Sequence, residues 1–339
     1  MKKIRVEKAV GTVLAHDITR IIPGKFKGVG FKKGHVVRKE DIPELLKLGK
    51  QSLYVLKLTP DQLHEDDAAI RIAQAITGGN LSWTAPREGK STITSNCDGL
   101  LKVNAAGLLA INKLGSIIIS TLKTNSPCRK GQVVAGTRII PLTIPAGKIA
   151  RLEELAARRH PLLQILPYRK MRVGGVATGS ELYNGLVKDE FDQYVAQKVI
   201  DYGCEFVKKI VVPDDVVAIS RAILELDTLG CDLILTTGGL SVDPDDVTRK
   251  GIRKAGARVI SYGSPVLPGA MFLYARLGDK PILGLPACVY HSPTTAYDLI
   301  LPRVLAGEEI TRNTVAEMGH GGLCLNCEVC RYPVCPFGK

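Results

Sequence analysis

The sequence has few aromatic residues and no long hydrophobic run. Aromatic side chains make up 5% of its 339 residues, with a single tryptophan. No apolar stretch approaches the roughly 18 residues that a membrane-spanning helix needs. The first residues, MKKIRVEKAV, are basic but lack the apolar stretch of a signal peptide. We therefore expect a cytoplasmic protein that does not enter a membrane.

The positive charge of the chain is concentrated in its N-terminal half. The net charge is +13, and residues 1–50 hold 13 Lys and Arg against 5 Asp and Glu. Nucleic-acid binding is one interpretation of such a surface. Because few aromatic residues and no nucleic-acid-reading motif accompany the charge, we favour a solvated face or a rim that attracts a polyphosphate ligand.

The length and the pattern of elements predict several domains. A chain of 339 residues exceeds one ordinary core. We expect a mixed α/β segment over 1–60, a helix and a β-rich domain over 61–165, an α/β domain over 166–308 and a cysteine-rich tail over 309–339. In the second part, Thr59 and Pro60 predict the start of a helix. Its later runs, LLAIN among them, predict short strands.

From residue 171 the strand and helix patterns alternate regularly. Strand–helix–strand at this spacing predicts a mainly parallel sheet covered by helices on both faces, a three-layer α/β fold. MFLYARLGDKPILGLP predicts a hairpin at one edge of the sheet, and TTAYDLILPRVLAG predicts a closing helix. Beyond it, EEITRNTVAEMGHGG has the composition of a polar linker that contributes little to a core.

One strand of this sheet runs into an unusual loop, DLILTTGGLSVDPDDVT (232–248). In open parallel sheets, ligands bind beyond the carboxyl ends of the strands. The N–H groups of Gly238 and Gly239 can surround a phosphate, and Ser241 can add a hydroxyl. Asp246 could cap the following helix or hold Mg²⁺ beside the phosphate. A plain glycine turn with a capping aspartate is the competing interpretation. The GxxxxGK[ST] and GxGxxG fingerprints are missing, which disfavours those two nucleotide folds.

Five segments resemble one family in order and spacing. VATGSEL, IVVPDD, the glycine–aspartate loop, LPGAMFLYARLGDKPILGLP and the helix up to VLAG are similar to the molybdopterin-binding domain of molybdopterin adenylyltransferases and molybdotransferases. HEDDAAIRIAQAITG and KGQVVAGTRIIPL resemble ancillary regions of a molybdotransferase-like protein. The resemblance is strongest over residues 171–307.

The resemblance implies a role for each polar residue at the strand ends. Asp214 and Asp246 would lie beside the phosphoanhydride of an adenylylated pterin and a Mg²⁺ ion, where the phosphate is positioned and its charge neutralised while molybdate meets the dithiolene sulfurs. The residues that would bind the pterin phosphate or line the same mouth are Thr178, Gly179, Glu181, Thr237, Gly238, Gly239 and Ser241. Relatives form dimers or trimers, so we expect a homo-oligomer.

The sequence departs from the family pattern in two places. Only IIPGKFKGVGFKKGH stands where molybdotransferases carry a motif rich in proline, aspartate and methionine, and LPACV (285–289) replaces LPGNP. His291 nearby is a candidate ligand contact, or a surface histidine. The first hypothesis is a molybdotransferase-like enzyme. The second is a non-catalytic carrier, chaperone or sensor that docks on a molybdoenzyme. A third is the related fold used in pyridine-nucleotide salvage.

Four of the nine cysteines crowd into the last sixteen residues. Cys324, Cys327, Cys330 and Cys335 form the pattern C-x₂-C-x₂-C-x₄-C-P. This resembles a ferredoxin run with one extra residue, and either Cys335 or His320 would be the fourth ligand. An iron–sulfur cluster, a zinc ion and a redox or sulfur-handling segment remain as alternatives, beside a disordered tail of reduced thiols.

Overall fold

The computed structural model describes residues 2–22, 26–55, 61–241 and 247–338. Their contacts divide the chain into two compact units. The first unit comprises 1–97, 101–124 and 129–165, and the second comprises 98–100, 125–128 and 166–339. None of the described helices is long and apolar enough to cross a membrane.

The first unit begins with a small module that has its own apolar cluster. Its strands pair antiparallel, β1 with β4 and β2 with β3, and η1, η2 and helix α1 lie between them in sequence. Leu14, Leu45 and Leu53 are buried there. The elements are β1 (Lys2–Arg5), η1 (Val6–Lys8), β2 (Ile18–Ile22), β3 (Phe26–Phe31), η2 (Lys39–Asp41), α1 (Ile42–Lys47) and β4 (Ser52–Val55).

The rest of the first unit is a four-stranded antiparallel sheet with helices packed on it. Its strand order is β6-β7-β11-β9, and β5 and β12 form a separate pair. Helix α2 contacts β7, β11 and α4, while α3 contacts β9 and α4. The bounds are β5 (Gln62–His64), α2 (Glu65–Ile76), β6 (Leu81–Trp83), β7 (Lys90–Ser95), α3 (Ala105–Asn112), β9 (Ile117–Thr121), β11 (Val133–Ile139), β12 (Thr143–Pro145) and α4 (Ala146–Ala157). Strands β8 (Gly99–Val103), β10 (Pro127–Cys128) and β13 (Leu163–Pro167) stand where the chain passes between the units.

Two local predictions for this unit are wrong. The helix expected from Thr59 and Pro60, which lie outside the described residues, begins only at Glu65, because residues 62–64 pair with β12. LLAIN belongs to helix α3, not to a strand. The Asn104 side chain caps that helix by accepting a hydrogen bond from the Gly107 N–H at 2.9 Å, which overrides the strand propensity of the apolar run.

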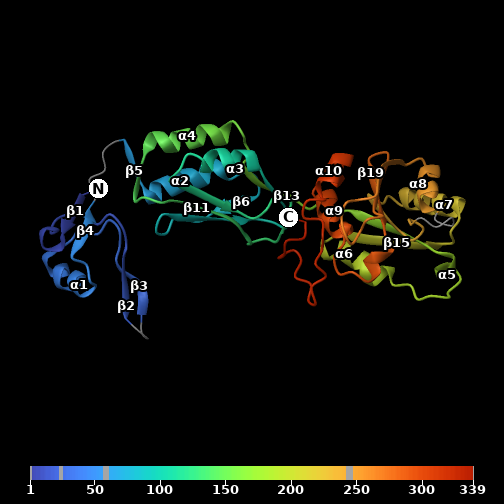
Figure 1. Ribbon diagram of the computed structural model, residues 1–339, viewed down its shortest axis with the longest axis horizontal. Coiled ribbons are helices and arrows are strands. Elements are labelled where there is room, and N and C mark those ends of the chain that lie inside the picture. The colour runs from blue at the N-terminus through green and yellow to red at the C-terminus, as the bar shows by residue number, and fades with distance from the viewer. Residues whose placement is uncertain (1, 23–25, 56–60, 242–246, 339) are drawn as a thin grey trace. The chain divides into compact units, whose positions relative to one another are not determined.

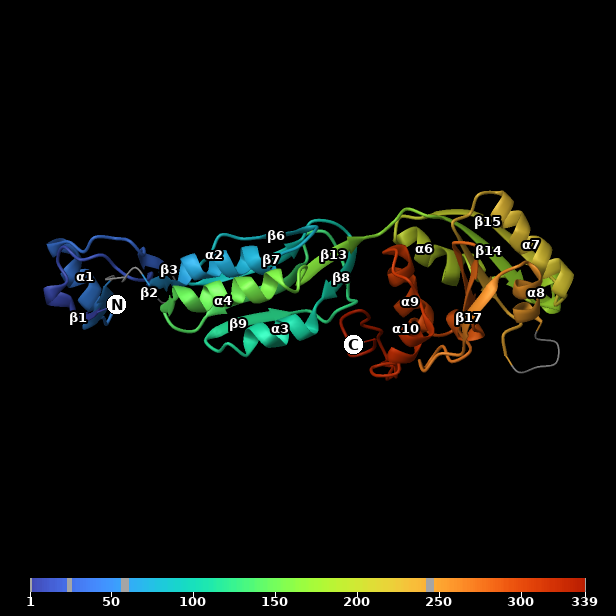
Figure 2. The same cartoon turned by 90° about the horizontal axis from the view of Figure 1, so that it is seen from above.

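The second unit is the predicted three-layer α/β fold. Its sheet has the order β15-β14-β16-β19-β18-β17, in which β15, β14, β16 and β19 run parallel and only β18 runs opposite, pairing antiparallel with both β19 and β17. Figures 1 and 2 show α7 and α8 on one face and α6, α9 and α10 on the other. The strands are β14 (Arg172–Thr178), β15 (Glu205–Val212), β16 (Leu233–Thr237), β17 (Arg258–Tyr262), β18 (Leu273–Leu277) and β19 (Lys280–Leu285).

Side chains alternate between the two faces of this sheet. Val176, Ile234 and Ile282 pack with α7 and α8, whereas Leu233 and Leu283 pack with the helices of the opposite face. The helical elements are α5 (Ser180–Tyr183), η3 (Asp192–Ala196, π-helical), α6 (Gln197–Asp201), α7 (Val216–Thr228), α8 (Thr248–Lys254), η4 (Ala287–Tyr290), α9 (Ala296–Leu305) and α10 (Arg312–Glu317).

The segment expected to be a polar linker is part of the second core. Ile310, Val315 and Met318 are buried in the cluster that includes α9, and Phe337 joins it from the end of the tail with 3% of its surface exposed. The prediction that this stretch contributes little to a core is therefore wrong. Thr311 caps α10 by accepting a hydrogen bond from the Thr314 N–H, and Thr314 and Val315 of this helix are buried despite its polar composition.

Candidate functional site

The parallel strands bring four chain segments to one edge of the sheet. Strand β15 lies on one side of β14 and β16 on the other, so the order of connections reverses between β14 and β16. Ligands of open α/β sheets bind beyond the carboxyl ends of the strands at such a switch point. Thr178 ends β14 and Thr237 ends β16. We call this rim the carboxyl edge.

Gly238 and Gly239 form a tight turn directly after β16. Their φ angles are +83° and +56°, in the region that favours glycine. A Cβ on Gly238 would lie 2.1 Å from the Thr178 carbonyl oxygen, and one on Gly239 would lie 2.5 Å from Thr248 Oγ1. The two glycines are therefore required by the contact of the turn with β14 and α8, independently of any ligand.

Three threonines fix this turn in place. Thr178 Oγ1 lies 3.1 Å from the Thr237 carbonyl and 3.1 Å from Thr248 Oγ1, which in turn lies 2.9 Å from the Gly238 carbonyl. Each hydroxyl carries one proton, so two of these three contacts can be hydrogen bonds at a time. Thr178 and Thr237 are buried. Both residues were predicted to bind the ligand, but these contacts direct the Thr178 hydroxyl into the protein.

The turn leaves hydrogen-bond donors available. The backbone N–H groups of Gly238 and Gly239 have no acceptor among the described residues. Ser241 is exposed, and the Tyr262 hydroxyl holds the chain beside it by donating to the Leu240 carbonyl at 2.7 Å. Successive free N–H groups in a turn with left-handed backbone form a concave anion-binding site. Two such N–H groups are donors of the kind that an anion accepts from.

Asp214 reaches the same edge from the loop after β15. Its Oδ2 atom accepts hydrogen bonds from the Ser180 N–H at 2.8 Å and the Ser180 hydroxyl at 3.1 Å. This contact joins the loops that follow β14 and β15, with Gly179 buried between them and Glu181 exposed on α5. The neighbouring Asp215 caps α7 by accepting from the N–H groups of Val217 and Ala218.

Tyr290 also belongs to the carboxyl edge, and the sequence did not identify it. It ends η4, the turn after β19, and its hydroxyl donates a hydrogen bond to Thr237 Oγ1 at 2.8 Å. Burial raises the pKa of this phenol. The only sequence signal was the position of PACVYHS after a strand. His291, the residue that we considered as a ligand contact, is exposed beside it.

Asp246 lies outside the described residues, so its predicted pairing with Asp214 stays a prediction. Among the described residues, the acidic and thiol groups near Asp214 form no cluster able to hold a metal ion; the one such group is His64, Glu65 and Asp66 in the first unit. There Lys33 forms an ion pair with Asp66 at 2.9 Å. The tail cysteines lie elsewhere in the second unit and together line one pocket.

Comparison with known proteins gives two family matches. Residues 174–306 match the sequence model described as "Probable molybdopterin binding domain", and residues 3–57 match a domain of unknown function (DUF8806). The molybdopterin molybdenumtransferase of Haemophilus influenzae is 26% identical over 185 residues, which cover 52% of this chain and 43% of that protein. A CinA-like protein of Citrifermentans bemidjiense is 33% identical over 97 residues, covering 29% and 23%. The chain thus spans less than half of either relative.

Two solved structures are also similar to this chain. The molybdopterin biosynthesis enzyme MoaB of Thermus thermophilus is 21% identical and covers 41% of this chain and 98% of its own, with a TM-score of 0.35. The molybdopterin biosynthesis protein MoeA of Pyrococcus horikoshii is 15% identical and covers 90% and 74%, with a TM-score of 0.36. The family resemblance inferred from the sequence is confirmed for residues 174–306 by the family match.

Proposed function

Residues 174–306 form a domain of the molybdopterin-binding family, and we propose that this chain holds molybdopterin by its phosphate at the carboxyl edge. The free N–H groups of Gly238 and Gly239 are the observation that carries the proposal. They lie at the switch point of the sheet, where ligands of this fold class bind. The Ser241 hydroxyl would supply a further donor to the phosphate.

The proposed activity is that of a molybdotransferase-like protein in molybdenum cofactor biosynthesis. On adenylylated molybdopterin, water would attack one phosphorus of the phosphoanhydride, the bridging P–O bond would break, and AMP and molybdopterin with its single phosphate would be released. The chain's own contribution would be to hold the phosphates in the orientation in which water can attack. Asp214 Oδ1, together with Asp246, would hold the Mg²⁺ ion that neutralises phosphate charge.

A carrier function is the second candidate, and one observation favours it. Asp214 Oδ2 is already engaged by Ser180, and among the described residues Asp214 belongs to no group of three or more ligand-type side chains close enough to share a metal ion. A protein that only holds the cofactor needs N–H and hydroxyl groups that donate hydrogen bonds to the phosphate, but it needs no acidic residues that bind a metal ion. The carrier would release its cofactor to a molybdoenzyme.

Mass spectrometry of the gently purified full chain tests binding. The wild-type protein is expected to carry a molybdopterin species, and Ser241→Ala is expected to reduce its amount. The acidic residue at the site is tested by Asp214→Asn, and Asp279→Asn is its matched control. Asp279 is fully exposed in the turn between β18 and β19, at the opposite edge of the sheet. A wild-type protein that neither retains a pterin nor binds added molybdopterin would overturn the proposal.

Turnover separates the two candidates. With adenylylated molybdopterin, Mg²⁺ and molybdate, an enzyme releases AMP, and Asp214→Asn should slow that release by about 10²-fold, as for lost electrostatic positioning. Pterin binding should survive the substitution. Retained pterin without AMP release by the wild-type chain would establish the carrier instead.

A further inference from the structure

The four tail cysteines converge on one pocket of the second unit. Cys324, Cys327, Cys330 and Cys335 all line it. His320, the alternative fourth ligand, is exposed and does not line the pocket. The structure therefore selects Cys335 to complete the set.

Both ends of the cysteine segment are fixed to the α/β domain. At its start, Leu267 N–H donates to the Gly322 carbonyl and Cys324 N–H donates to the Leu267 carbonyl, each at 2.8 Å. At its end, Phe337 is buried in the core and the Gly338 N–H donates to the Gly321 carbonyl at 2.9 Å. The last hydrogen bond closes residues 321–338 into a ring that holds the thiols around the pocket.

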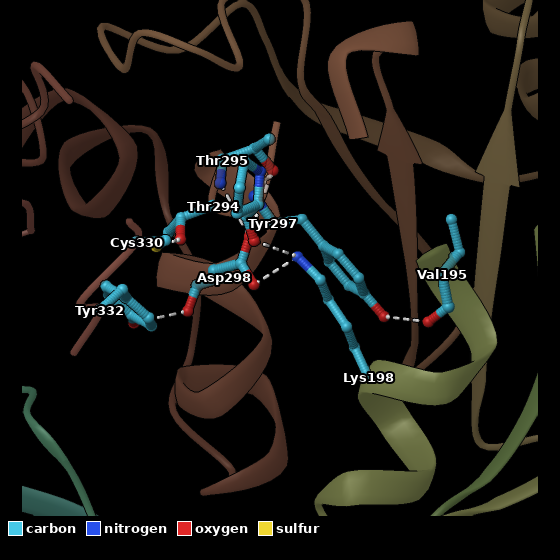
Figure 3. Close-up of polar contacts among 9 residues, drawn as sticks. Val195, Lys198, Thr294, Thr295, Tyr297, Asp298, Cys330 and Tyr332 are labelled. Carbon is cyan, nitrogen blue, oxygen red and sulfur yellow. Dashed lines mark hydrogen bonds and ion pairs between the residues drawn. The ribbon is translucent and has the colours of Figure 1, made fainter. Parts of the chain in front are cut away.

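Residues 292–294, which directly precede α9, form one wall of this pocket. Asp298 accepts from the Thr295 N–H at 2.7 Å in a capping box and pairs with Lys198 at 2.6 Å (Figure 3). The Tyr332 hydroxyl donates to the Asp298 backbone carbonyl at 3.0 Å, which ties the tail to the same turn. These contacts fix residues 294–298 before any metal binds.

One hydroxyl on this wall contacts a thiol. Thr294 is buried, and its Oγ1 atom lies 3.2 Å from Cys330 Sγ (Figure 3). A metal-bound thiolate has no proton to give, so the hydroxyl must then be the donor. Hydrogen bonds to ligand sulfurs are one of the means by which proteins tune iron–sulfur clusters.

A single metal ion and a cluster differ in the distance between their ligand sulfurs. In a tetrahedral zinc site with Zn–S distances of about 2.3 Å, the sulfurs stand about 3.8 Å apart. No three thiol sulfurs of the described residues lie within 4.8 Å of one another. A four-iron cluster assigns each thiolate to a different iron atom, so its ligands surround a wider space.

We propose that Cys324, Cys327, Cys330 and Cys335 bind a four-iron iron–sulfur cluster in this pocket. The site uses no residue of the carboxyl edge and needs no bound pterin, so its test is independent of the test of the proposed function. Thr294 acts through Cys330 as a positioning residue.

The experiment uses the full chain purified without oxygen, or reconstituted with ferrous iron and sulfide. We expect about four iron atoms and four sulfides per chain and a broad visible absorbance that dithionite bleaches. Cys327→Ser and Cys335→Ser should each lower the iron content at least about tenfold, the lower limit known for outer-shell changes, because each removes a ligand itself. Cys288→Ser and His320→Ala are the matched controls and should keep it, with far-UV circular dichroism confirming that each variant folds.

Replacing Thr294 with valine provides a second readout. The hydroxyl stabilises the more negative reduced cluster, so Thr294→Val should keep the iron and lower the reduction potential. Stoichiometric zinc without sulfide, or no metal in either preparation, would overturn the proposal. Loss of iron in His320→Ala with retention in Cys335→Ser would overturn the assigned ligand set.

Discussion

Replacing Phe337 with alanine should destabilise the second unit, although the residue stands two positions from the end of the chain. Its side chain is 3% exposed and meets the Tyr332 ring edge-on with the centroids 6.2 Å apart. Both residues pack on the cluster that contains α9 and α10. The substitution removes a ring from the margin of this core and leaves a cavity.

The expected loss follows from the burial of the ring. Truncating a buried phenylalanine costs about 3–5 kcal/mol, and Phe337 belongs at the lower end because Tyr332 beside it is only partly buried. A loss of about 3 kcal/mol lowers the melting temperature of a domain of 150–250 residues by about 6–12 °C.

The single tryptophan makes the assay specific. Trp83 lies in the first unit, so its fluorescence follows that unit, while far-UV circular dichroism follows both. Phe337→Ala should shift the dichroism transition of the second unit and leave the tryptophan signal unchanged. Val334→Ala is the matched control, since Val334 is 81% exposed and its truncation should change stability by less than about 0.5 kcal/mol. Equal melting of the two variants would refute the packing that we describe.

Two further predictions concern the glycine turn and a buried histidine. Gly238→Ala should lower the free energy of unfolding by about 3 kcal/mol or more, because steric overlap with Thr178 adds to a strained backbone. Gly278 also has a positive φ but has open space around it, so Gly278→Ala should lower that free energy by only about 1–2 kcal/mol. Chemical denaturation of both variants measures the difference. Burial lowers the pKa of His64 in the folded chain. Below pH about 6.5 the unfolded chain therefore binds more protons than the folded chain, and the free energy of unfolding of the first unit should decrease as the pH falls through that value. A Trp83 unfolding series should show this loss in the wild type and a flatter profile in His64→Gln, and equal slopes would contradict it.

The sheet of the second unit was largely predictable because most of its elements carry a local signal. Strand β16 is an apolar run that ends at two glycines, and the helix patterns between the parallel strands determine the direction of the sheet. Strand β17 was missed because RVISY has only weak alternation, and it pairs with β18 through tertiary context.

The candidate site was predictable at the level of segments rather than of atoms. Strand ends identified Thr178, Asp214 and the double glycine, because parallel strands must end at one edge. The sequence could not indicate that the Thr178 hydroxyl faces the protein, nor that Tyr290 bonds to Thr237, since both depend on packing across 53 or more positions. The tail cysteines were visible from spacing alone, but their anchoring through Phe337 was not.

The segment after β19 connects the two proposed sites within a few residues. Tyr290 contacts Thr237 at the carboxyl edge, and Thr294, four positions later, contacts Cys330 in the tail pocket. This is also where LPACV departs from the pattern of the molybdotransferase family. The sequence of this short segment must therefore suit the proposed phosphate site at one end and the thiol site at the other. The altered residues directly precede Tyr290, and Thr294 stands just before the first turn of α9, which the Lys198–Asp298 ion pair fixes.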